Sequence, residues 1–163
     1  MRHLLLFFVL LTVQLPAQVA KTIEPTQAGT LSSYITSQEK TTITGLTLKG
    51  KLDARDFAFM RDEMKNLMTL NLSKATIYAY TGSQGTIKGT TTTYPSNEIP
   101  AFAFYNLVLL TYKPSLTAVT LPENAISVGE QAFYFSWNIT SMTLPNSVKK
   151  IGDYAFYGCY ALS

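Results

Sequence analysis

Histidine, cysteine and charged residues are scarce in this chain of 163 residues. The only histidine is His3 and the only cysteine is Cys159, while Asp, Glu, Lys and Arg together make up 14% of the residues. A single cysteine excludes an internal disulfide framework. The net charge is +3 and the basic residues are scattered, so the sequence predicts no nucleic-acid partner.

The start of the chain, by contrast, is strongly apolar. Leu4–Val13 is an almost unbroken apolar run behind Arg2, and Ala17 and Ala20 supply small residues for cleavage. The run is shorter than the ~20 residues that a membrane-spanning helix needs. We therefore expect residues 1–20 to be a signal peptide and the protein to be secreted or at the cell surface. Membrane contact is expected only through export or an anchor outside this chain.

The lack of histidine also limits the possible chemistry. Once residues 1–20 are removed, Ser–His and Cys–His nucleophilic sites and His/Cys zinc sites are excluded. Asp62 and Glu63 form the only adjacent acidic pair, and we interpret them as part of a solvated helix face. The stretch 82–89 lacks the spacing of a phosphate-binding loop. The sequence therefore predicts no catalytic residue, no metal and no cofactor.

A unit that recurs after 23 residues dominates the C-terminal part of the chain. Ile139–Pro145 repeats Leu116–Pro122, and Ile151–Tyr157 repeats Val128–Tyr134 at the same offset. Fainter copies occur upstream, at Ile43–Leu48, Leu67–Leu72 and Ile99–Tyr105. The last apolar positions of each copy alternate, as on one face of a short strand. One unit cannot bury its own apolar face, but a stack of units can.

These repeats predict an α/β solenoid, with short parallel strands on the concave face and turns and short helical pieces outside. Residues 21–42 are expected to form an N-terminal cap with a short helix near 31–35, and residues 43–163 the repeat domain. A helix over 53–66 begins at Asp53, with Asp56 three residues later. Residues 81–97 are expected to form an inserted loop or hairpin. Leu162 opens a further copy, so we expect the natural array to continue beyond Ser163.

The repeat pattern Val/Ile-Gly-x-x-Ala-Phe, followed by Leu-x-x-Val-x-Leu-Pro, resembles the bacterial surface leucine-rich repeats of the BspA type. The resemblance covers residues 99–163 and, more loosely, 43–77. It implies an exported protein with a curved solenoid fold that acts in adhesion or host binding. Two places depart from the family pattern: the insertion after Tyr105, and Trp137-Asn138.

Two candidate ligand-binding surfaces follow from the repeat. The first is the outward side of the strands, with the residues Thr69, Asn71, Ala118, Thr120, Ser141 and Thr143. The second is an aromatic surface, in which Tyr105, Tyr134 and Tyr157 form a ladder and Trp137 lies nearby. Each surface has a plainer interpretation, as a solvated β face or as cover for the shoulder of the solenoid. Cys159 occupies the place of Ser136 one repeat earlier, which favours a small packed residue over a reactive thiol.

The leading functional hypothesis is a non-catalytic module that recognises or adheres to a protein or glycan partner. Two alternatives remain: an accessory module of a larger exported enzyme, and a purely structural spacer.

Overall fold

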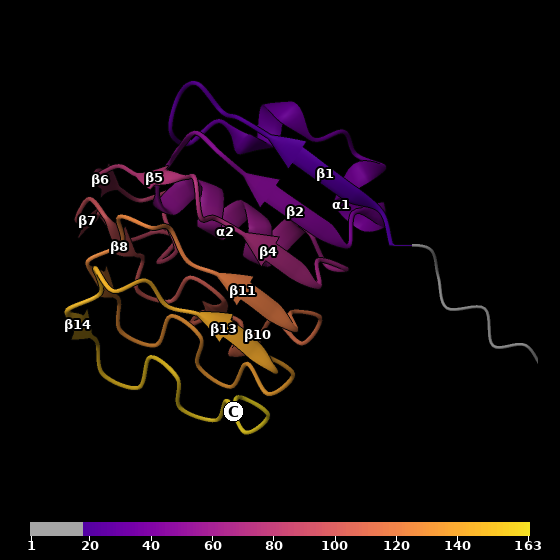
Figure 1. Cartoon of the computed structure of the whole chain (residues 1–163). Coiled ribbons are helices and arrows are strands. Elements are labelled where there is room, and N and C mark those ends of the chain that lie inside the picture. The colour runs from indigo at the N-terminus through magenta and orange to yellow at the C-terminus, as the bar shows by residue number, and fades with distance from the viewer. Residues whose placement is uncertain (1–17) are drawn as a thin grey trace, which may run out of the picture.

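The main feature of the molecule is a five-stranded parallel sheet, seen here in a computed structural model that describes residues 18–163 (Figure 1). Its strands lie side by side in chain order, so that each coil of the chain adds one strand next to the last. They are β1 (Ala20–Ile23), β2 (Gly45–Leu48), β4 (Thr69–Asn71), β11 (Ala118–Thr120) and β13 (Ser141–Thr143).

The register of this sheet follows the sequence repeat. Ala118 pairs with Ser141, 23 residues later, and on its other side with Thr69. The central residues of three strands, Leu46, Leu70 and Val119, are each 2% exposed and face the core. The residues on either side of them form two rows across the opposite face, which we call the sheet face. The first row is Ala20, Gly45, Thr69, Ala118 and Ser141, and the second is Thr22, Thr47, Asn71, Thr120 and Thr143.

Helix α2 (Ala54–Glu63) lies behind β2 and β4 (Figure 1). The N-cap predicted at Asp53 is confirmed: its side chain accepts from the Arg55 N–H, and the Asp56 carboxylate accepts from the Asp53 N–H. Asp56 also accepts from the N–H groups of Gly29 and Leu31, at 2.7 and 2.9 Å. One buried carboxylate therefore starts the helix and holds the preceding segment against it.

A column of phenylalanines runs through the core from coil to coil. The ring centroids of Phe57, Phe104, Phe133 and Phe156 follow one another at 6.2, 5.2 and 5.5 Å. The alanines that precede the last three rings, at 103, 132 and 155, are buried as well. This confirms that each Ala-Phe pair packs inward. Gly129 is needed for close approach, because a Cβ there would collide with the Ala101 backbone.

The wall opposite the sheet face differs from the prediction of turns and helical pieces. It carries a second parallel sheet, β14-β12-β8, made of β8 (Glu98–Ile99), β12 (Ser127–Val128) and β14 (Lys150–Ile151). A strand of two residues is too short to show an alternation of apolar and polar residues, so the sequence did not reveal these strands. The next turn holds Phe102, Gln131 and Tyr154 at φ of 58°, 49° and 56°, so each coil uses a left-handed residue that is not glycine.

The remaining elements lie in the N-terminal segment, in two hairpins and in one short parallel pair. The segment contains a 3₁₀ helix, η1 (Leu31–Tyr34), and α1 (Glu39–Thr42). The hairpins are β6 (Tyr80–Gly82) with β7 (Thr92–Tyr94), and β9 (Tyr105–Asn106) with β10 (Thr111–Tyr112); β3 (Lys51–Leu52) pairs with β5 (Thr76–Ile77). No helix within residues 18–163 is long and apolar enough to cross a membrane.

Strand β1 corrects the sequence analysis, which placed the first strand at 43–48. Ala20–Ile23 pairs with β2 over its whole length. The Val19 N–H donates to Thr44 Oγ1 at 3.0 Å, and Gln18 Nε2 donates to Thr69 Oγ1 at 3.4 Å. Residues 1–17, which hold most of the predicted signal peptide, lie outside the described residues; Gln18–Ala20 belong to the folded unit.

Candidate functional site

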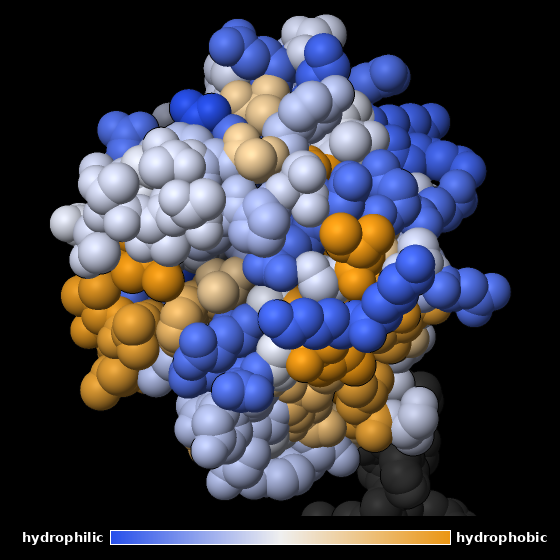
Figure 2. Space-filling view, turned by 90° about the vertical axis from the view of Figure 1, so that its left-hand side faces the viewer, coloured by the Kyte–Doolittle hydropathy of each residue, from blue (hydrophilic) through white to orange (hydrophobic). Residues whose placement is uncertain are grey.

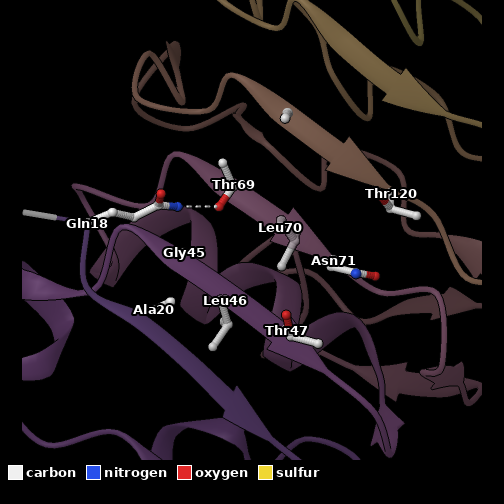
Figure 3. Close-up of a pocket in the computed structure, with 10 residues that line it drawn as sticks. Gln18, Ala20, Gly45, Leu46, Thr47, Thr69, Leu70, Asn71 and Thr120 are labelled. Carbon is white, nitrogen blue, oxygen red and sulfur yellow. Dashed lines mark hydrogen bonds between the residues drawn. The ribbon is translucent and has the colours of Figure 1, made fainter.

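The sheet face carries a shallow hollow of about 270 Å³ (Figure 3). Its residues come from β1, β2, β4 and β11 and from Gln18, whose amide reaches Thr69 (Figure 3). The lining is Gln18, Ala20, Gly45, Leu46, Thr47, Thr69, Leu70, Asn71, Ala118 and Thr120. It combines hydroxyl and amide groups with a small apolar floor. None of these ten side chains is ionisable at neutral pH, so the surface offers hydrogen bonds rather than charge.

The hollow exists because the first row carries small residues. Ala20, Gly45 and Ala118 stand on three of its strands. A Cβ at Gly45 would lie 3.0 Å from Thr69 Oγ1 and 3.1 Å from Gln18 Nε2, so any larger residue would fill the space. The second row, with Thr47, Asn71 and Thr120, forms a polar border.

A second hollow, of about 630 Å³, lies where the same strands begin. It is lined by the residues that immediately precede β2, β4 and β11, namely Thr44, Met68 and Thr117, together with Asn66, Asn138 and others. Its lining also carries no ionisable side chain. Met68 is 44% exposed and gives this neutral region an apolar contact point.

The structure brings all six predicted strand residues together on the sheet face. Thr69, Asn71, Ala118 and Thr120 line the hollow, whereas Ser141 and Thr143 lie one strand beyond it. The rest of the lining was not among the predicted residues. Gly45 and Thr47 could have been found, because they stand 24 residues before Thr69 and Asn71 in the copy at Ile43–Leu48. Gln18 and Ala20 were assigned to the signal peptide.

The predicted tyrosine ladder forms, but one of its members is not on the surface. Tyr105 and Tyr134 have ring centroids 4.9 Å apart, and Tyr134 stacks on Tyr157 at 5.3 Å. Tyr105 is only 8% exposed, because it lies in the β9–β10 hairpin and packs against Phe102 and Tyr134. Tyr105 therefore offers little of its ring to a ligand. Tyr157 remains 50% exposed.

Trp137 does not continue that ladder. Its ring stacks on Tyr112 of β10 at 4.7 Å and is 45% exposed. It meets the ladder only through Phe135, at 6.0 Å. The two places where the chain departs from the repeat, the insertion and Trp137, therefore lie against each other.

The helix face with Asp62 is not simply solvated, which corrects a second interpretation. Arg61 is buried, and its Nη1 donates to the carbonyls of Thr86, Phe102 and Tyr105. Burial would raise the pKa of Asp62, but hydrogen bonds from Arg61 and Lys88 outweigh it and lower that pKa to about 2. This cluster joins α2 to both insertions, which the helix pattern alone could not reveal.

Lys113 belongs to the same buried region. Its Nζ donates to the Met64 carbonyl at the end of α2. Burial lowers its pKa to about 8, although the nearby Asp62 carboxylate acts in the opposite direction. The group ties β10 to the helix.

Cys159 packs as the repeat predicts. It is half-buried against the core, and its Sγ donates to the Phe133 carbonyl at 3.2 Å. Burial raises the pKa of the thiol, which disfavours the reactive thiolate. Across residues 18–163, no three His, Cys, Asp or Glu side chains lie close enough together to hold a metal ion.

Comparison with known families identifies the repeat. The family model described as BspA type leucine rich repeat region (6 copies) matches residues 97–163. No curated protein is similar enough to count as a match. The matched residues include β11, β12, β13 and β14, which supply the 23-residue register of both parallel sheets. The family implies a solenoid-like repeat fold. Residues 97–163 are thus similar to the BspA-type leucine-rich repeats.

Proposed function

We propose that this protein is an exported or cell-surface recognition module that binds a protein or glycan partner on its sheet face without catalysing a reaction. Export is supported by the apolar run Leu4–Val13 and by the family. In this proposal the protein is a solenoid whose concave side is the sheet face.

The observation that carries the proposal is the neutral lining of the two hollows on and beside the sheet face. Short hydroxyl and amide groups surround the glycine and alanines of this face, and no charged side chain lines either hollow. Such a surface can approach a partner closely and exchange hydrogen bonds with it. A neutral glycan or an uncharged stretch of protein matches it, whereas a nucleic acid does not.

A binding array of extracellular matrix proteins and glycans tests this proposal, with the full chain and two variants. Ala118→Trp fills the hollow from a half-buried position of the sheet face and should lower the affinity for any retained partner at least tenfold, about 1.4 kcal/mol. Ile126→Trp is the matched control, because Ile126 is 48% exposed and lies outside the hollow. It should bind like the wild type.

The same array separates the alternatives. If no protein or glycan is retained, a structural spacer or an accessory module is favoured and the proposal fails. If a partner is retained but only Tyr157→Ala and Trp137→Ala weaken it, the aromatic residues are the binding surface instead.

A further inference from the structure

The β9–β10 hairpin exposes four successive aliphatic residues. Leu107, Val108, Leu109 and Leu110 form its tip and are 41%, 70%, 68% and 70% exposed. Single exposed leucines are ordinary on a protein surface, but an uninterrupted group of four is not. Figure 2, a view from the side of β6, β7 and β14, shows that apolar residues reach the surface in patches between polar areas.

The backbone of the tip is held in a fixed shape. Asn106 Oδ1 accepts from the N–H groups of Val108 and Leu109, at 3.1 and 3.0 Å. Asn106 is itself buried, and its Nδ2 donates to Asp62 Oδ1 at 3.0 Å. Leu110 adopts a left-handed φ of 50°, which is unfavourable for leucine. The N–H groups of Val108 and Leu109 therefore have their hydrogen-bond partner inside the hairpin, while the apolar side chains are exposed. An apolar medium requires this, because it offers no hydrogen bonds to backbone groups.

Two exposed lysines flank this tip. Leu109 lies between two hollows of about 340 and 380 Å³, one lined by Lys65 and the other by Lys88. Arg61 and Lys113 are buried and donate to backbone carbonyls, so Lys65 and Lys88 are the basic side chains that this lining exposes. The Lys88 side chain is 54% exposed and also lies 2.7 Å from Asp62, and Glu63 is the exposed carboxylate of the lining.

Aromatic side chains stand at the base of the hairpin. Tyr112 follows Thr111 in β10 and stacks on the exposed Trp137. Tyrosine and tryptophan favour the boundary between water and hydrocarbon, because each has an apolar ring and a polar group.

We propose that this hairpin inserts its tip into the surface of a membrane that contains anionic lipids. The aliphatic side chains of Leu107–Leu110 enter the hydrocarbon boundary, Tyr112 and Trp137 lie at headgroup depth, and Lys65 and Lys88 face lipid phosphates. A protein partner fits less well, because a stable interface covers about 800 Å² on each side and four residues on a narrow turn offer far less. This contact goes beyond the one expected from the sequence, which was limited to export or an absent anchor.

The single tryptophan of the chain makes the test direct. The full chain is mixed with phosphatidylcholine vesicles, with and without phosphatidylglycerol, and quenching of Trp137 by brominated lipid is recorded. We expect quenching that strengthens with anionic lipid and weakens with salt. Leu109→Asn should raise the lipid concentration for half-maximal quenching about tenfold or more, because it removes one leucine side chain from the hydrocarbon boundary.

Controls separate the tip from the rest of the chain. Ile126→Asn makes the same kind of substitution at an exposed aliphatic residue elsewhere on the surface and should leave quenching unchanged. The apolar run Leu4–Val13 is present in every variant, so the tip is tested by the difference in quenching between variants and not by quenching of the wild type alone. Val108→Asn is a second tip variant for the case that Leu109→Asn does not fold. Equal quenching in wild type and both tip variants would overturn the proposal, and so would self-association that depends on the tip in the absence of quenching.

Discussion

Replacing Phe133 by alanine removes the central ring of the phenylalanine column. The side chain is fully buried, and its ring stacks on Phe104 at 5.2 Å and on Phe156 at 5.5 Å. Truncation of a buried phenylalanine costs ~3–5 kcal/mol, and the loss of two stacked pairs places this site in the upper half of that range. A domain of ordinary stability, about 5–15 kcal/mol, would lose a large part of its free energy of unfolding.

Urea unfolding measures this loss, with Trp137 emission and far-UV circular dichroism as independent probes of one transition. Tyr134→Ala is the matched control, because Tyr134 is the next residue but only half-buried. This variant should lower the free energy of unfolding by ~1–2 kcal/mol, because it loses the contacts of Tyr134 with Tyr105 and Tyr157. A loss below ~1 kcal/mol for Phe133→Ala, or equal losses for both variants, would refute the packing described here.

Three further substitutions test other parts of the fold by their free energies of unfolding. Asp62→Asn should cost about 2 kcal/mol at neutral pH, because the Asp62 pKa is lowered from 3.8 to about 2 on folding; wild type and variant should converge as the pH falls from 4 to 2, and a constant difference would contradict this. Ser136→Ala should be neutral or stabilise by up to ~1 kcal/mol, because Ser136 Oγ is buried without a hydrogen-bond partner among the described residues; a clear loss would reveal a missed contact. Gly129→Ala should cost ~1–3 kcal/mol through its collision with the Ala101 backbone, and no loss would mean that the coils are spaced more widely.

The parts of the fold that depend on the repeat were predictable. The pairing of Ala118 with Ser141 follows from the 23-residue offset, because in a stack of coils the sequence repeat becomes the strand register. Asp53 could be predicted as the start of the helix, because the N-cap residue and Asp56 lie within four residues of each other. At such positions the neighbouring side chains or the exact repeat determine the local structure.

The parts that interrupt the repeat were not predictable. Arg61 belongs to an ordinary helix face by its spacing, and only the two hairpins folded over it make it buried. Tyr105 matches Tyr134 in the repeat, but the β9–β10 hairpin takes it out of solvent. β1 was missed because only Ile23 of its four residues is buried, which leaves too weak an alternation to recognise.

Much of the candidate site could therefore be predicted from the sequence. Thr69, Asn71, Ala118 and Thr120 were identified because the repeat determines which strand positions face outward. The hollow itself was not, because its depth depends on Gly45 and on Gln18, a residue that the sequence places in the signal peptide.

The central claim is that the partner binds the sheet face, and site-specific photo-crosslinking tests it most directly. A benzophenone side chain is placed at Thr120, on the border of the hollow, or at Tyr78, which is 43% exposed and outside it. Each protein is irradiated with the partner retained on the array. The account predicts a covalent adduct from position 120 and none from position 78. An adduct from position 78 alone, or equal adducts from both positions, would contradict it.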